Sequence, residues 1–379
     1  MMPAKPISSR QLALMAAGSA LVFPYTFLPI LETPNANQDA WIVLLLSLVY
    51  VVVINAPTLF IMNRLRGLTV NQASETVLGK AAGKAACMVI ALFCIFCFTA
   101  CTMITALFVR QFIIPETPVL ALVLLVVLPA IYAAAMGPET IGGLSIALVS
   151  VILISSVFFF IMGLNLMEPK MLQPMLADST FLQLNAGAFL TAARYSEMLI
   201  FWVYSYYLVE ESSITKTYVA AIAVFGATYM LLLLPVLMMF GYELAQHLSN
   251  PYYMYTLYVE ALGFLRRLQS LNVLTWFPMA ALKITIYLYM AGHLLSGIFA
   301  VRSHRIFIYL LAPVCVVVCM IPAFNSAPFI EWLRSDKVFP FIVLPATLLV
   351  PWVTAAVYLI RRKAVDAAVR KIRESNKEP

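Results

Sequence analysis

Three charged residues lie inside long apolar runs of the sequence, where a charge is costly. Arg194 and Glu197 are three residues apart, so they share one face of a helix. Lys283 lies in another run and has no acidic residue beside it. Charged side chains inside a membrane are rare, and they normally mark a binding site, an ion path or a proton relay. We therefore take these three residues as candidates for binding a charged ligand.

Each of these charges also has a purely structural interpretation. Arg194 and Glu197 can pair with each other and only hold the helices together. Lys283 needs water, a ligand carboxylate, a helix C-terminus or Glu197 as its partner, and a structural counter-ion explains it as well as a ligand or coupling role does. The tyrosines Tyr195 and Tyr287, next to the charged positions, complete the candidate set around them.

The first apolar run offers a place where the backbone itself can bind a ligand. It contains Ala17, Gly18 and Ser19, followed by Pro24. Because proline removes a backbone donor and clashes with the preceding turn, the helix can break at mid-membrane, and its freed amides can hold an anionic group such as a carboxylate. In the third run, Thr102 adds a hydroxyl that either contacts the ligand or bonds back to its own helix.

Other kinds of chemistry have little support in the sequence. All six cysteines lie in apolar runs, and Cys94 and Cys97 form a C-x-x-C pair without a histidine or a second pair nearby. We interpret them as small packing residues rather than as a redox or zinc site. The histidines His247, His293 and His304 are far apart, and no phosphate loop, nucleophile elbow or nucleic-acid motif is present. We therefore expect neither an enzyme nor a metal, cofactor or nucleic-acid site.

The elements that position these residues must be membrane helices. Hydrophobic residues make up 63% of the 379 residues and charged residues only 11%, whereas a soluble domain carries about 25% charged residues. A span needs about 20 apolar residues, so the chain has room for about ten. The apolar runs predict spans at residues 12–31, 41–62, 85–109, 118–136, 144–167, 187–208, 217–240, 271–299, 306–321 and 339–360.

The basic residues predict how these spans are oriented. An even number of spans puts both termini on one side, and 16 of the 24 lysines and arginines fall on that side against six on the other. The positive-inside rule then makes both termini cytoplasmic. We predict a transmembrane domain at 1–360 and a basic cytoplasmic tail at 361–379 that lies on the anionic inner leaflet. The segments 65–84 and 241–270 are predicted to form interfacial helices, the second of them over the outer mouth.

Five short motifs occur in an order that resembles a known family. They are ISSRQLALMAAGSALVFPY at 7–25, QDAWI at 38–42, LGKAAGK at 78–84, IIPETP at 113–118 and SEMLIFWVYSYY at 196–207. With these motifs, the chain resembles the B subunit of bacterial endospore nutrient germinant receptors, a branch of the amino acid–polyamine–organocation transporter superfamily. The similarity runs over nearly the whole chain.

This resemblance implies a fold, a site and partners. The fold would be an all-α integral membrane protein of about ten transmembrane helices, in a five-plus-five inverted repeat with helices 1 and 6 broken. The germinant site would lie between helices 1, 3, 6 and 8, with Glu197 at the family's usual glutamate. The resemblance also implies assembly with A and C subunits in the endospore inner membrane. Two positions depart from the family pattern, Gln269 in place of a frequent acid and Arg194.

Two functions are consistent with these features. The first is a nutrient receptor subunit in which a small molecule, most simply an amino acid, shifts an equilibrium because it binds two states with different affinity. The second is a transporter of amino acids or organic cations that is coupled to protons through Glu197 or Lys283. Because one fold serves both, the fold alone does not decide between them.

Overall fold

The structure is a computed structural model, and it describes residues 6–32, 37–177, 179–193, 195, 197–209, 212–260, 268–334 and 339–375. The α-helices are α1 Ser9–Phe27, α2 Ala40–Ile54, α3 Ala56–Arg64, α4 Val70–Leu78, α5 Lys80–Phe112, α6 Val119–Met136, α7 Pro138–Met162, α8 Phe181–Ala193, α9 Met198–Tyr204, α10 Ile214–Ala245, α11 Pro251–Tyr258, α12 Gln269–Ile298, α13 Arg305–Met320, α14 Ala327–Arg334, α15 Phe339–Leu344 and α16 Val350–Ser375. Short 3₁₀ turns cover Pro29–Glu32, Asn37–Asp39, Leu164–Leu166, Pro169–Leu172 and Ser205–Tyr207, and a π turn covers Pro345–Leu349. Within the described ranges the chain forms no β-sheet.

Each predicted span falls on helical structure. Seven helical segments of the described chain are long and apolar enough to cross a membrane: Asn37–Arg64, Lys80–Phe112, Val119–Met136, Pro138–Met162, Ile214–Ala245, Ser270–Ile298 and Phe341–Ile372. The other three predicted spans coincide with α1, with α8 and α9 together, and with the shorter apolar helix α13. The hydrophobic runs therefore locate the helices of the bundle correctly.

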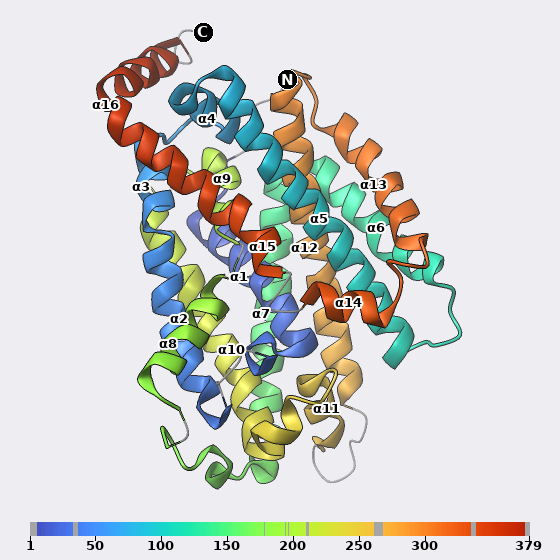
Figure 1. Cartoon of the computed structure of the whole chain (residues 1–379). Coiled ribbons are helices and arrows are strands. Elements are labelled where there is room, and N and C mark those ends of the chain that lie inside the picture. The colour runs from blue at the N-terminus through green and yellow to red at the C-terminus, as the bar shows by residue number, and fades with distance from the viewer. Residues whose placement is uncertain are drawn as a thin grey trace.

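The way the helices pack has the symmetry of a five-plus-five repeat. In span order, α1 is the first span and α10 the seventh, and these two pack together; α8 belongs to the sixth span and packs on α2 of the second. If five is added to or subtracted from each span number, the pair of spans 1 and 7 becomes the pair of spans 6 and 2. The helices α5 and α12, the third and eighth spans, exchange with each other and pack along each other through the middle of the bundle (Figure 1). This is the packing that two repeated halves with opposite orientation produce.

The two predicted helix breaks differ in position. The sixth span is interrupted between Ala193, where α8 ends, and Met198, where α9 begins. The first span stays helical past Pro24 and leaves the helix only at Leu28, whose φ of 44° is left-handed. Side chains from other parts of the fold donate to carbonyls near the proline, as Trp276 does to Val22.

Both termini lie at the same face of the bundle, and α11 lies at the opposite face (Figure 1). The predicted tail does not begin as a separate segment, because α16 continues across residue 361 with one non-helical position, Arg361. Beyond this kink, Val365 and Val369 pack into a second apolar cluster with residues of α3 and α4, among them Val77. The described part of the tail thus uses its apolar face against α4 rather than against a lipid surface.

The two predicted interfacial segments both contain a helix. The segment 65–84 forms α4, which packs on α5 and α16. The segment 241–270 forms α11, where Tyr252, Tyr253 and Tyr255 are buried and Tyr258 is exposed. Because most of its tyrosines are buried, α11 packs onto the bundle, against α1, α10 and α12, at the face opposite the termini.

Candidate ligand-binding site in the helix bundle

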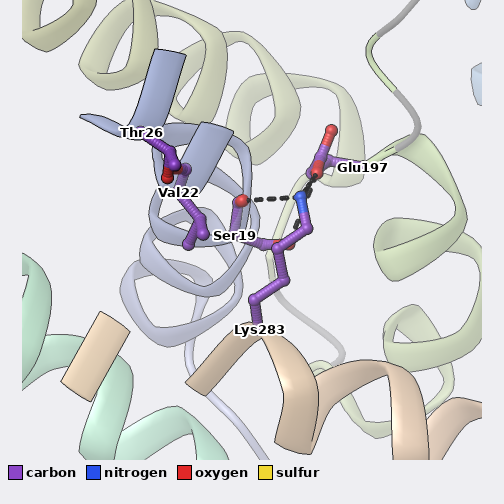
Figure 2. A network of polar contacts seen from close by, with 5 residues as sticks. All are labelled: Ser19, Val22, Thr26, Glu197 and Lys283. Atoms are coloured by element: carbon purple, nitrogen blue, oxygen red, sulfur yellow. Dashed lines mark hydrogen bonds and ion pairs between the residues drawn. The ribbon is translucent and has the colours of Figure 1, made fainter. Parts of the chain in front are cut away.

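The centre of the candidate site is an ion pair between α12 and the start of α9. Lys283 is fully buried, and its Nζ lies 2.9 Å from Glu197 Oε1. The same ammonium donates a hydrogen bond of 2.9 Å to the backbone carbonyl oxygen of Ser19 in α1. The Ser19 hydroxyl donates to the same oxygen of Glu197 at 3.4 Å. Figure 2 shows how the lysine reaches from α12 to both partners. Three segments far apart in sequence therefore meet at one ammonium group.

Aromatic rings surround the rest of this ammonium group. Lys283 Nζ lies 4.1 Å from the centre of the Phe23 ring and 5.7 Å from that of Tyr287. A cation over an aromatic face within about 6 Å is attracted to the ring, most strongly when water is excluded. The site thus combines a carboxylate, a carbonyl and aromatic faces, which are the groups that stabilise a buried cation.

Glu197 reaches the ammonium because of the break in the sixth span. It directly precedes α9 and makes no side-chain hydrogen bond that caps this helix. Its carboxylate is instead directed to Ser19 and Lys283. Glu197 lies in the interruption between α8 and α9, and its carboxylate reaches Ser19 and Lys283 from there.

A second contact ties α12 to α1 one turn further along α1. Trp276 Nε1 donates to the hydroxyl of Thr26 at 3.1 Å and to the carbonyl of Val22 at 3.3 Å. The Thr26 hydroxyl itself donates to Val22 at 2.8 Å. Trp276 and Lys283 are seven residues apart, two turns of α12, so both project from one face of that helix. This face holds α1 in place beside the ion pair.

A small cavity adjoins Glu197 on the side of α10. It is lined by alanines of α1 (Ala16, Ala17 and Ala20), by Tyr195, Glu197, Met198 and Phe201 around the break, by Val51 of α2, and by Tyr218, Ala221, Ile222 and Phe225 of α10. Its volume is about 20 Å³, which has room for about one water molecule. Apart from Glu197, the two tyrosine hydroxyls and the backbone, the lining is apolar. The cavity is therefore too small for a ligand of several heavy atoms, which requires it to widen.

Side chains close the bundle on the α11 side of the site. The rings of Phe108 and Trp276 lie 4.4 Å apart, and Tyr253 of α11 packs against Phe108 at 5.7 Å. A second contact joins Tyr252 of α11 to Tyr25 of α1, with ring centres 5.2 Å apart. Aromatic side chains of four helices thus cover the site from this face.

A polar cluster closes the other face, where the termini lie. The Tyr207 hydroxyl accepts a hydrogen bond of 2.9 Å from Tyr289 and lies 3.3 Å from His293 Nδ1. Next to it, the backbone of Ile7 pairs with the segment around Leu208. These contacts link the N-terminal segment and the end of the sixth span to α12.

The structure brings most of the predicted site residues together but gives some of them other surroundings. Ser19, Glu197 and Lys283 are in direct contact, and Tyr287 adjoins the ammonium. Ala17 and Tyr195 line the cavity. The contact that Ser19 makes with the ammonium uses its carbonyl oxygen, whereas the sequence predicts amides that hold an anion. The site is thus built for a positive charge at this point.

Three further candidate residues, Gly18, Thr102 and Arg194, are not among the contacts of the ion pair that the structure describes. A Cβ atom on Gly18 would lie 2.6 Å from side-chain atoms of both Met279 and Val149, so Gly18 is a packing position between α7 and α12. The Thr102 hydroxyl donates to the carbonyl of Phe98 in its own helix. Arg194 lies outside the described residues.

Several residues of the site have no charge or motif to signal them. Phe23 follows Ser19 by four residues, and Thr26 follows it by seven. These are the spacings of one helix face, so the face could be found once Ser19 was chosen. The residues of α10 that line the cavity, such as Phe225, look like ordinary core residues in sequence. The described residues contain no cluster of three metal-binding side chains, and the six cysteines are buried and free.

The fold resembles those of solved membrane transporters. The structure of MhsT in complex with L-phenylalanine matches with a TM-score of 0.62 and 13% identity, over 94% of this chain and 99% of the other. Mhp1, a nucleobase-cation-symport-1 family transporter with bromovinylhydantoin bound, matches with a TM-score of 0.60 and 14% identity, over 95% and 80%. A Na⁺-coupled sialic acid symporter matches with a TM-score of 0.55 and 15% identity, over 94% and 78%. At these identities the likeness concerns the fold, which is that of an integral membrane protein.

Sequence comparison adds the family. No curated protein sequence matches the chain. The model of the spore permease family, described as spore germination protein, matches residues 6–327. This range contains α1, α5, α9 and α12, and so every residue of the ion pair and its surroundings. The family and the structural neighbours are permeases and transporters rather than enzymes. The chain belongs to the family of spore germination proteins.

Proposed function

We propose that the protein is the nutrient-sensing subunit of a spore germinant receptor. It binds a small molecule, most simply an amino acid, at the site around Glu197 and Lys283. The observation that carries this proposal is the small cavity next to a buried ion pair that joins α1, α12 and the start of α9. Buried charges in a membrane protein normally serve function. Here one of them, Glu197, lines a cavity that a ligand can occupy if the cavity widens.

The small size of the cavity also suggests how binding is signalled. A cavity with room for one water cannot hold an amino acid, so the ligand-bound state must separate the elements that line it. Ala17 and Ala20 come from α1, and Phe225 comes from α10, so these helices have to move apart. A ligand that binds this wider state shifts the population toward it. The A and C subunits of the receptor then respond to the changed positions of the helices through their contacts with this chain.

Amino acids are the simplest ligand class for chemical reasons. The cavity lining offers apolar surface for a side chain and Glu197 for an amino group. Lys283, which contacts Glu197 from outside the lining, can supply a basic group for a carboxylate. The structural neighbour MhsT is in complex with L-phenylalanine, so a bundle with this fold accommodates an amino acid. Both points support an amino acid without selecting one side chain.

We assign the protein to the endospore inner membrane with both termini in the cytoplasm. The family supports a role in spores. The termini lie at one face, and exposed basic residues gather at the ends of the helices there, among them Lys80, Arg302, Arg362 and Arg370. Basic residues prefer the cytoplasmic side of a membrane.

A proton-coupled transporter of amino acids or organic cations is the second candidate. It is favoured by the likeness to symporters in fold and by the presence of two ionisable groups in contact, Glu197 and Lys283. In this function, exchange of a proton at the pair accompanies transport. The two candidates share the binding site and differ in whether the ligand crosses the membrane.

Two measurements on the same variants distinguish the candidates. Spores that carry Glu197→Gln in place of the wild-type chain are tested for germination with single nutrients, and the purified protein is tested for uptake of those nutrients into liposomes. The receptor function predicts a lost response and no uptake by the wild-type protein. Uptake that depends on a pH gradient would favour the transporter. A normal germination response of the variant spores would contradict a role of Glu197 in sensing.

A further inference from the structure

Lys283 occupies an ammonium-binding site that other parts of the chain build. Its hydrogen-bond acceptors are Glu197 Oε1 and the Ser19 carbonyl, both at 2.9 Å, and the Phe23 ring lies 4.1 Å away. These groups belong to α1 and to the break before α9, whereas the lysine comes from α12. Apart from the more distant ring of Tyr287, α12 thus contributes to this site only the ammonium itself.

We propose that this is the binding site for the primary ammonium group of the ligand and that Lys283 is its resident occupant, which the ligand displaces. The proposal deepens the proposed function, because it rests on a ligand that binds in the adjoining cavity. It names the chemical class of that ligand, a primary amine, and it gives Lys283 the role of a tethered competitor.

The surroundings of Glu197 make such an exchange possible. Glu197 contacts the ammonium and also lines the cavity, so an amine that enters the cavity meets the same carboxylate. Both ammonium groups donate to the same acceptors, so the exchange leaves no buried carboxylate unpaired, which is the costly outcome. The side chain of Lys283 has four flexible methylene groups and can withdraw. Its released charge then favours a ligand that also carries an anionic group.

A cavity-forming variant tests the idea without knowledge of the nutrient. Lys283→Ala removes the atoms from Cγ to Nζ, which correspond to n-propylammonium. This ion should fill the vacated space and restore the contacts to Glu197 and Ser19. At a concentration about ten times its Kd, we expect propylammonium to raise the thermal midpoint of purified Lys283→Ala by about 2 °C. The wild-type protein should respond clearly less at the same concentration, because its own tethered ammonium competes for the site.

Matched controls separate the ammonium site from general solvent effects. Propanol lacks the charge, and tetramethylammonium lacks N–H donors, so neither should stabilise Lys283→Ala. Lys283→Met fills the space with an apolar chain and should not respond to propylammonium. Lys216→Ala, at an exposed lysine of α10, controls for the loss of any lysine. The double variant Glu197→Gln with Lys283→Ala lacks the carboxylate and should lose most of the stabilisation.

Each outcome decides for or against the proposal. Stabilisation of Lys283→Ala clearly above that of the wild type, by propylammonium alone, supports it. No stabilisation, or an equal effect on the wild type or on the double variant, overturns it. If Lys283→Ala is recovered only as aggregate, the yield of folded protein after solubilisation with and without propylammonium replaces the thermal midpoint, and an unchanged yield overturns the proposal.

The amine experiment is independent of the proposed function. If propylammonium binds Lys283→Ala but no nutrient stabilises the wild-type protein, the sensing function fails and the ammonium site stands. If a nutrient stabilises the wild-type protein but propylammonium has no effect on Lys283→Ala, the resident-lysine proposal fails alone.

Discussion

Glu197→Gln is the substitution whose effect follows most directly from the structure. It keeps the size of the side chain and removes its charge, so the ammonium of Lys283 loses its counter-ion while the rest of the site is unchanged. Lys283 is fully buried and the Glu197 side chain is 11% exposed. Bulk water therefore has little access to the ammonium, and the adjoining cavity has room for only about one water molecule.

The burial of both partners sets the magnitude. Breaking a buried ion pair by neutralising one partner costs about 3–5 kcal/mol. The glutamine carbonyl can still accept a hydrogen bond from Lys283, so we expect the lower end, about 3 kcal/mol of the free energy of unfolding. Lys283→Met leaves the carboxylate unpaired and should cost at least as much. The double variant Glu197→Gln with Lys283→Met carries no charge at this site, so it should be at least as stable as the less stable of the two single variants. The cycle should then give a coupling energy of about 3 kcal/mol or more.

The assay is chemical unfolding of the purified proteins in one detergent, with the four members of the cycle measured side by side. Glu243→Gln and Lys216→Met, both at exposed positions, show the effect of the same chemical changes outside the site. A coupling energy near zero would refute the ion-pair reasoning. A double variant that recovers stability but lacks a nutrient response would separate the function of Glu197 from its structural role.

Three other predictions test the packing, the orientation and the pH dependence of the fold. Gly18→Leu should lower the free energy of unfolding by about 1–3 kcal/mol through overpacking, while Gly143→Leu, in open space, should not; equal unfolding midpoints would contradict the packing. Cysteine at exposed Lys170 should react with an impermeant reagent in intact cells and cysteine at Lys363 only after permeabilisation, against native cysteines that are all buried; the reverse pattern would invert the orientation. Burial lowers the pKa of His304, helped by a neighbouring arginine, so the unfolded state binds more protons near pH 6 and stability should fall as the pH drops below about 6.5. His304→Gln should flatten that profile, and an unchanged slope in thermal midpoint against pH would exclude His304 as the cause.

The sequence is sufficient to place the helices and to find the charged centre of the site. Twenty apolar residues in a row have few alternatives to a membrane helix, which is why all ten predicted spans fall on helices. A buried lysine needs an anionic partner, and Glu197 is the only acidic residue within the ten predicted spans. The sequence therefore offers no other acid within the spans as the partner of Lys283.

The remaining features depend on tertiary contacts that no local pattern encodes. Proline next to small residues predicts a break in the first span, yet the helix continues past Pro24 and ends only at Leu28. At the site, the carbonyl of Ser19, rather than a freed amide, makes the contact with the charged group, because the ammonium of Lys283 approaches it from another helix.

The tail and Gly18 illustrate a second limit. The segment after residue 360 has a basic, amphipathic sequence typical of a membrane-surface helix, but the described part places Val365 and Val369 on α4. An amphipathic pattern shows that one face is covered, not what covers it. Gly18 is likewise predicted to belong to a broken segment whose backbone binds a ligand. In the structure, its lack of a side chain leaves room for Met279 and Val149 to pack against α1.

The most direct test of the central claim is a thermal-shift measurement with single nutrients on two proteins, the wild type and the double variant Glu197→Gln with Lys283→Met. Ligands that bind the folded state raise its thermal midpoint. If the buried pair forms the nutrient site, at least one small nutrient stabilises the wild-type protein and the double variant, although folded, does not respond. A nutrient that stabilises both proteins equally would place the binding site elsewhere and contradict the account.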